Sequence, residues 1–109
     1  MQVQLHDSLS TPSQGRERFI LDRLEERLDR YANRVQRTVV SLSETRKEHG
    51  HSETRCRIAA SLGPLGTVVV TSEDDGVHQA FSGALKQVTR GIQRRIERRV
   101  QFQRPVEPR

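Results

Sequence analysis

Basic side chains recur at helical spacing toward the C-terminal end of the chain. Lys86, Arg90, Arg94 and Arg98 are four residues apart, so they share one side of a helix, and Arg95 extends the same positive surface. Guanidinium groups bind phosphate oxygens through two parallel hydrogen bonds and stack on bases. This spacing predicts binding of a polyanion, and among polyanions the excess of arginine over lysine favours RNA.

A second basic stripe runs along a helix predicted between residue 12 and residue 33 or 35. Its members are Arg16, Arg23, Arg27, Arg30 and Arg34. The acidic residues of this helix form a separate stripe, made of Asp22, Glu25, Glu26 and Asp29. Solvated salt bridges within the helix would explain both stripes. However, the arginine stripe borders the apolar side instead of alternating with the acids, so we expect it to lie beside the neighbouring helix.

The positive charge is concentrated at one end of the sequence. The formal net charge is +5, and residues 85–109 hold eight Lys or Arg against two acids. A solvated basic helix end is the simpler explanation, and polyanion binding is the functional one. Three Phe, one Tyr and no Trp leave little for base stacking. Any RNA would therefore be recognised through its backbone and shape.

Other chemistry finds little support in the sequence. His49 and His51, with Cys56 nearby, resemble metal ligands, but a second pair of ligands at zinc spacing is missing. Cys56 also falls in an alternating apolar run, which predicts a core position. The acidic residues 73–75 are explained by helix capping. We predict no catalytic residue, no metal, no cofactor and no small-molecule substrate, and hence a binding protein, not an enzyme.

The hydrophobic periodicity predicts six elements. The first helix has Thr11 as its N-cap, Pro12 at its first position and Gln14 at the capping-box position. In chain order the elements are a strand at 2–6, a helix from 12 to 33 or 35, strands at 37–44, 52–62 and 67–71, and a helix at 72–100.

This order, β-α-β-β-β-α, predicts an α+β fold with a four-stranded sheet and two helices packed on one face. Each helix has one apolar stripe for that face. Residues 56, 58, 60 and 62 alternate with Arg55 and Arg57, which would project from the open face. We expect a single domain at residues 1–100 and a short tail at 101–109. No apolar run reaches the length of a membrane span, and the N-terminus lacks signal-peptide features, so we expect a monomeric, cytoplasmic protein without a membrane partner.

The chain resembles a known family in its order of elements, in the strand that ends at LGPLG, and in the stretch EDDGVHQAFSGALKQVTRGIQRR. It is similar, over residues 1–100, to the short form of the ribosome hibernation promoting factor and ribosome-associated inhibitor family. This resemblance implies a protein that is not an enzyme and that binds the small ribosomal subunit near the decoding region, where it blocks transfer RNA and messenger RNA. It implies rRNA-binding roles for Arg90 and Arg94, and less directly for Arg16, Arg27 and Arg30.

Two alternatives belong to other classes. A three-stranded meander with flanking helices also resembles a general double-stranded-RNA-binding domain. A protein-interaction module is the other alternative, in which the open sheet face with Arg55 and Arg57 meets an acidic partner.

Overall fold

The order of elements agrees with the sequence prediction. The computed structural model describes the backbone of residues 1–11 and 15–103, and the side chains of these except residues 49 and 99–103. Its elements are β1 (Gln2–Asp7), α1 (Arg16–Leu28), β2 (Arg37–Arg46), β3 (Ser52–Ser61), β4 (Thr67–Asp74) and α2 (Val77–Gln103). The predicted α+β fold with the order β-α-β-β-β-α is confirmed.

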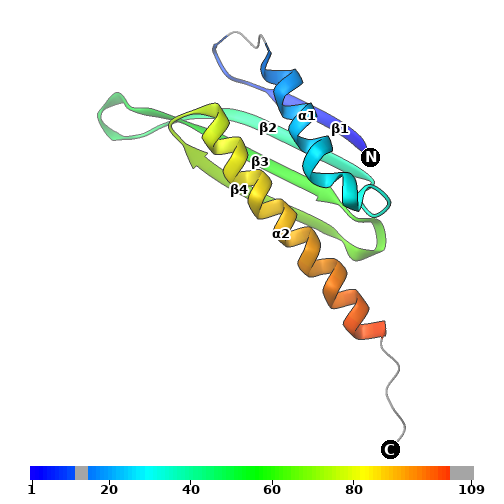
Figure 1. Ribbon diagram of the computed structural model, residues 1–109. Helices are drawn as coiled ribbons and strands as arrows, with labels where there is room; N and C mark the ends of the chain where they lie inside the picture. The colour runs from blue at the N-terminus through cyan, green and yellow to red at the C-terminus, as the bar shows by residue number, and fades with distance from the viewer. Residues whose placement is uncertain (12–14, 104–109) are drawn as a thin grey trace, which may run out of the picture.

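The four strands form one sheet in the order β1-β2-β3-β4, with both helices on the same face (Figure 1). β1 and β2 are parallel, and α1 supplies the crossover that a parallel pair requires. β2, β3 and β4 are antiparallel neighbours, which confirms the predicted meander.

The core lies between the sheet and the two helices. Along β3 the side chains of Cys56, Ile58 and Ala60 are fully buried, whereas Arg55 and Arg57 on the opposite face are exposed. The alternation predicted from the sequence is therefore confirmed. Burial raises the pKa of the Cys56 thiol to about 12, so the thiol is protonated at neutral pH and acts as an apolar filler.

The first helix is shorter than predicted. It begins at Arg16, and its N-cap is Gly15, with a φ of 72°, so the prediction of Thr11 as the N-cap is wrong. The predicted cap involves Pro12 and Gln14, which lie outside the described residues. α1 ends at Leu28 and continues as a 3₁₀ turn (Asp29–Tyr31), so the predicted end at residue 33 or 35 is wrong. The chain turns here because Val35 is buried and its N–H donates to the Tyr31 carbonyl.

The second helix starts later than predicted. The predicted start at Ser72 is wrong, because residues 72–74 continue β4 and pair with β3. The helical capping assigned to Glu73 is therefore wrong as well, since its carboxylate accepts hydrogen bonds from Arg55 on β3. At its other end α2 continues to Gln103, three residues beyond the expected end. Residues 104–109 of the expected tail lie outside the described part.

A glycine sets the distance between α2 and β4. A Cβ atom at Gly91 would lie 2.4 Å from Cγ1 of Val68, which is too close for two carbon atoms. Gly83 allows a similar approach to the Ser72 hydroxyl. Glycine costs helix stability relative to alanine, so its presence inside a helix indicates that close packing is required.

Replacing Gly91 by alanine is expected to destabilise the fold. The gain in helix propensity is about 1 kcal/mol, and the overlap with the buried Val68 costs about 1–3 kcal/mol, so we expect a net loss of up to about 2 kcal/mol. Urea denaturation measures this change. Gln87→Ala, at an exposed position of α2, is the control and should change stability little. A more stable Gly91→Ala variant would show that Val68 yields without strain.

Candidate nucleic-acid interface

Basic residues of the two helices meet in a groove. Arg23 and Arg27 of α1 and Lys86 of α2 line a small cavity of about 90 Å³ between the helices. The same cavity is lined by the α2 residues Phe81, Ser82 and Leu85. We call this the interhelical groove. Three cations from two elements thus converge on one concave site.

An aromatic contact holds the two sides of the groove together. The Phe19 ring of α1 packs edge-on against Phe81 of α2, with 6.0 Å between ring centroids, and also contacts His78 at 4.2 Å. The guanidinium carbon of Arg23 lies 5.5 Å from the centre of the Phe19 ring, at cation–π distance. Sequence reasoning missed this function of Phe19. The available signal is the spacing of four between Phe19 and Arg23, which places them together on the helix.

No described carboxylate neutralises the charges of the groove. Among the described residues, no carboxylate forms a salt bridge with Arg23, Arg27 or Lys86. α1 does carry acids, but Glu25 and Asp29 line a different cavity beside Met1. The acidic and basic stripes of α1 therefore lie on different sides of the helix. Like charges held close together favour binding of an anion between them.

The remaining basic positions of α2 extend the positive surface. Arg90, Arg94 and Arg98 are exposed, and within the described residues none of them forms a salt bridge. The C-terminal part of α2 projects beyond the sheet (Figure 1). Arg30 and Arg34 follow α1 and are also exposed, with the Arg30 guanidinium 5.7 Å from the centre of the Tyr31 ring.

Two predicted positions have structural partners instead. The Arg16 side chain is 11% exposed, and its Nη2 lies 2.7 Å from the Asp7 carboxylate. It also donates to the hydroxyl and carbonyl of Thr11. Arg95 donates from Nη1 to the Leu65 carbonyl at 2.8 Å, which ties α2 to the turn before β4. We therefore leave both residues out of the proposed RNA-binding surface.

Arg55, one of the two arginines on the open face of the sheet, also has a partner within the protein. Glu73 accepts hydrogen bonds from Arg55 and forms a 2.8 Å salt bridge with Lys47. The hydrogen bonds from Lys47 and Arg55 lower the pKa of Glu73, and Glu73 in turn raises the pKa of Lys47. Of the two arginines expected to meet an acidic partner, Arg55 is thus paired within the sheet, and Arg57 is exposed.

Comparison with known proteins identifies the fold. No family model matches the chain, and no curated protein matches it in sequence. Among solved structures it is similar to the N-terminal domain of Protein Y from Thermus thermophilus, with a TM-score of 0.68. The two share 24% sequence identity, and the match covers 86% of this chain and 98% of the other. The chain has the Protein Y fold. Since almost all of that Protein Y domain is matched, the likeness concerns the whole architecture and not one shared motif.

In the part of the chain that the structure describes, neither helix is long and apolar enough to cross a bilayer.

Proposed function

We propose that this chain is a ribosome-associated hibernation factor of the family that its sequence resembles. In this proposal it works in the cytoplasm as a monomer and binds small-subunit ribosomal RNA near the decoding region. Its body then occupies space that transfer RNA or messenger RNA requires. This function needs no catalytic group, metal or cofactor.

The convergence of cations in the interhelical groove is the observation that carries the proposal. The groove is lined by three cationic side chains, those of Arg23, Arg27 and Lys86. Among the described residues, no carboxylate forms a salt bridge with any of them. A phosphodiester is the anion that such a site fits, because guanidinium and ammonium groups donate several charge-assisted hydrogen bonds to phosphate oxygens.

The exposed arginines of α2 would continue the contact along the RNA. Arg90, Arg94 and Arg98 are four residues apart, so successive guanidinium groups are displaced by about 6 Å along the helix axis. In the proposed complex these residues bind phosphates next to the one in the groove, and Arg30 and Arg34 bind further phosphates beyond α1. Backbone contacts of this kind position a protein on a folded RNA without reading its bases.

The fold supports the same assignment. The similarity to the Protein Y domain covers 86% of this chain, and the elements of the chain follow the order that the family resemblance implies.

Co-sedimentation with purified small ribosomal subunits tests the proposal. The chain is expected to migrate with the subunit at low salt and to dissociate as salt is raised, with each phosphate contact contributing about 0.9 to the slope of log affinity against log salt. A single phosphate in the groove accounts for about 0.9 of this slope, and each exposed arginine that contacts a further phosphate adds about the same amount. Absence from the subunit fraction at low salt would refute the proposal. A plain RNA duplex is the comparison, because equal affinity for it would favour a general double-stranded-RNA binder.

A further inference from the structure

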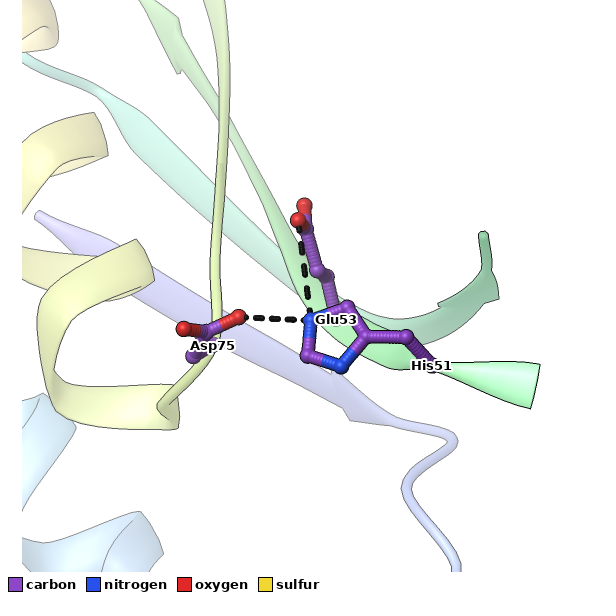
Figure 2. A group of neighbouring side chains, drawn as sticks. All are labelled: His51, Glu53 and Asp75. Atoms are coloured by element: carbon purple, nitrogen blue, oxygen red, sulfur yellow. Dashed lines mark hydrogen bonds and ion pairs between the residues drawn. The ribbon is translucent and has the colours of Figure 1, made fainter. Parts of the chain in front are cut away.

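Three side chains that can bind a metal ion come together where the β2–β3 loop lies beside the connection from β4 to α2. His51 is the last residue of the loop between β2 and β3, Glu53 lies in β3, and Asp75 lies between β4 and α2. Figure 2 shows the His51 ring between the two carboxylates, with its Nε2 atom turned toward both.

The distances suit a small metal ion. His51 Nε2 is 2.9 Å from Asp75 Oδ1 and 4.0 Å from Glu53 Oε1, and all three ligand atoms lie within 4.8 Å of one another. Metal–ligand bonds of about 2.0–2.1 Å at tetrahedral angles separate neighbouring ligand atoms by about 3.3 Å. The observed separations lie on both sides of this value, so small side-chain rotations would place all three around one ion.

The sheet register builds this arrangement. Thr54 pairs with Asp74 across β3 and β4, so the next position of β3, Glu53, is brought opposite Asp75, which directly follows β4. His51 is two residues before Glu53 and so projects from the same side of the strand. The loop that carries His51 is closed by a 2.6 Å hydrogen bond from the Lys47 N–H to the His51 carbonyl. Strand pairing and this hydrogen bond therefore hold the backbone that carries the three proposed ligands.

We infer that His51, Glu53 and Asp75 form a binding site for a divalent transition-metal ion, with Zn²⁺ as the best match. One imidazole with two carboxylates is a set that zinc accepts, whereas Mg²⁺ and Ca²⁺ prefer oxygen ligands alone. A fourth position is available to water, because Glu53 and Asp75 also line an adjoining cavity of about 280 Å³. The divalent charge offsets the two carboxylates.

The site would link segments that are distant in the sequence. It joins the β2–β3 loop to Asp75, which lies two residues before α2. A bound ion therefore stabilises the folded chain by mass action and fixes the start of the helix that carries Lys86 and the basic positions beyond it. Sequence reasoning considered His51 with Cys56 and predicted no metal site. Cys56 is indeed buried in the core, but Asp75 supplies a ligand that local spacing does not reveal.

Calorimetric titration of the metal-free full chain with ZnCl₂ tests this inference. One ion is expected per chain, and His51→Ala is expected to weaken binding at least about tenfold, as is the isosteric pair Glu53→Gln/Asp75→Asn. His6→Ala is the matched control, since His6 is an exposed histidine outside the cluster, and it should leave the affinity unchanged. Circular dichroism before titration confirms that each variant is folded.

Three results would overturn the inference. They are the lack of saturable Zn²⁺ binding, an equal loss from His6→Ala and His51→Ala, and Mg²⁺ or Ca²⁺ binding as tight as Zn²⁺ binding. None of these measurements involves ribosomes, so they are independent of the proposed function.

Discussion

Reversing the charge of Arg27 and Lys86 together is expected to weaken binding to the small ribosomal subunit by at least about a hundredfold at low salt. Each charge-assisted hydrogen bond that is lost costs about 1.5–3 kcal/mol, and the introduced carboxylates repel the phosphate that the groove would hold. The two residues belong to different helices and line the same cavity. The Arg27→Glu/Lys86→Glu variant therefore tests the groove itself, not a single helix.

Fluorescence anisotropy of labelled chain against purified subunits gives the affinity at several salt concentrations. The slope of log affinity against log salt is expected to fall by about 1, because the phosphate contact in the groove is removed. The matched control is Arg18→Glu/Arg57→Glu, which makes the same total change of charge at two exposed arginines outside the groove. Arg18 lies on α1 and forms a 3.5 Å salt bridge with Asp22, and Arg57 lies on the open face of the sheet. Equal weakening by this control would mean that binding depends on net charge alone.

The stability of the charge-reversal variant separates binding from folding. Arg27 and Lys86 are exposed and have no carboxylate partner among the described residues, so their replacement breaks no salt bridge. Removing positive charge from the groove reduces repulsion with Arg23. We therefore expect an unchanged or slightly higher melting temperature, and an affinity loss with such a result locates the effect in binding.

Strand faces could be predicted from the sequence because their period is short and local. The pleat alternates side chains strictly, so Cys56, Ile58 and Ala60 had to share one face once β3 was recognised. The apolar stripe of α1 was predictable for the same reason, since a helix repeats its faces every turn. The order of elements then restricted the fold to two helices on one side of the sheet.

Element ends were less predictable because their partners lie elsewhere in the chain. Residues 72–74 have the composition of a helix start, and only their pairing with β3 shows that they continue β4. Glu73 illustrates the cause. Its carboxylate meets Arg55 and Lys47, which come from a neighbouring strand and loop that no local window contains.

Some of the basic positions could also be predicted from local sequence, whereas others depend on partners elsewhere in the chain. The arginine stripe of α1 borders its apolar side, so its position near α2 could be anticipated, and Arg23 and Arg27 do lie there. Their shared groove with Lys86 depends on how the two helices meet, which periodicity does not give. Arg16 belongs to the same stripe, yet its partner Asp7 lies on β1. Helical spacing alone could not separate Arg16 from the other arginines.

Arg16→Ala is expected to destabilise the fold by about 2–3 kcal/mol. Breaking a buried ion pair costs about 3–5 kcal/mol, and slight solvent access lowers this value here. The side chains of Arg16 and Asp7 are 11% and 17% exposed. Asp7 also accepts a hydrogen bond from the Leu9 N–H, so the pair fixes the chain between β1 and α1. Urea denaturation measures the loss, and Arg18→Ala, at an 85% exposed side chain, should change stability by less than about 0.5 kcal/mol.

The same variant decides whether Arg16 stabilises the fold or binds RNA. If Arg16 serves the connection between β1 and α1, Arg16→Ala lowers the urea midpoint, whereas the folded protein keeps its affinity for the small subunit at low temperature. Asp7→Asn should then reproduce most of the loss, and the double variant should lose less than the two single changes added, because both act on one contact. A stable Arg16→Ala protein with weakened subunit binding would instead return Arg16 to the RNA-binding surface.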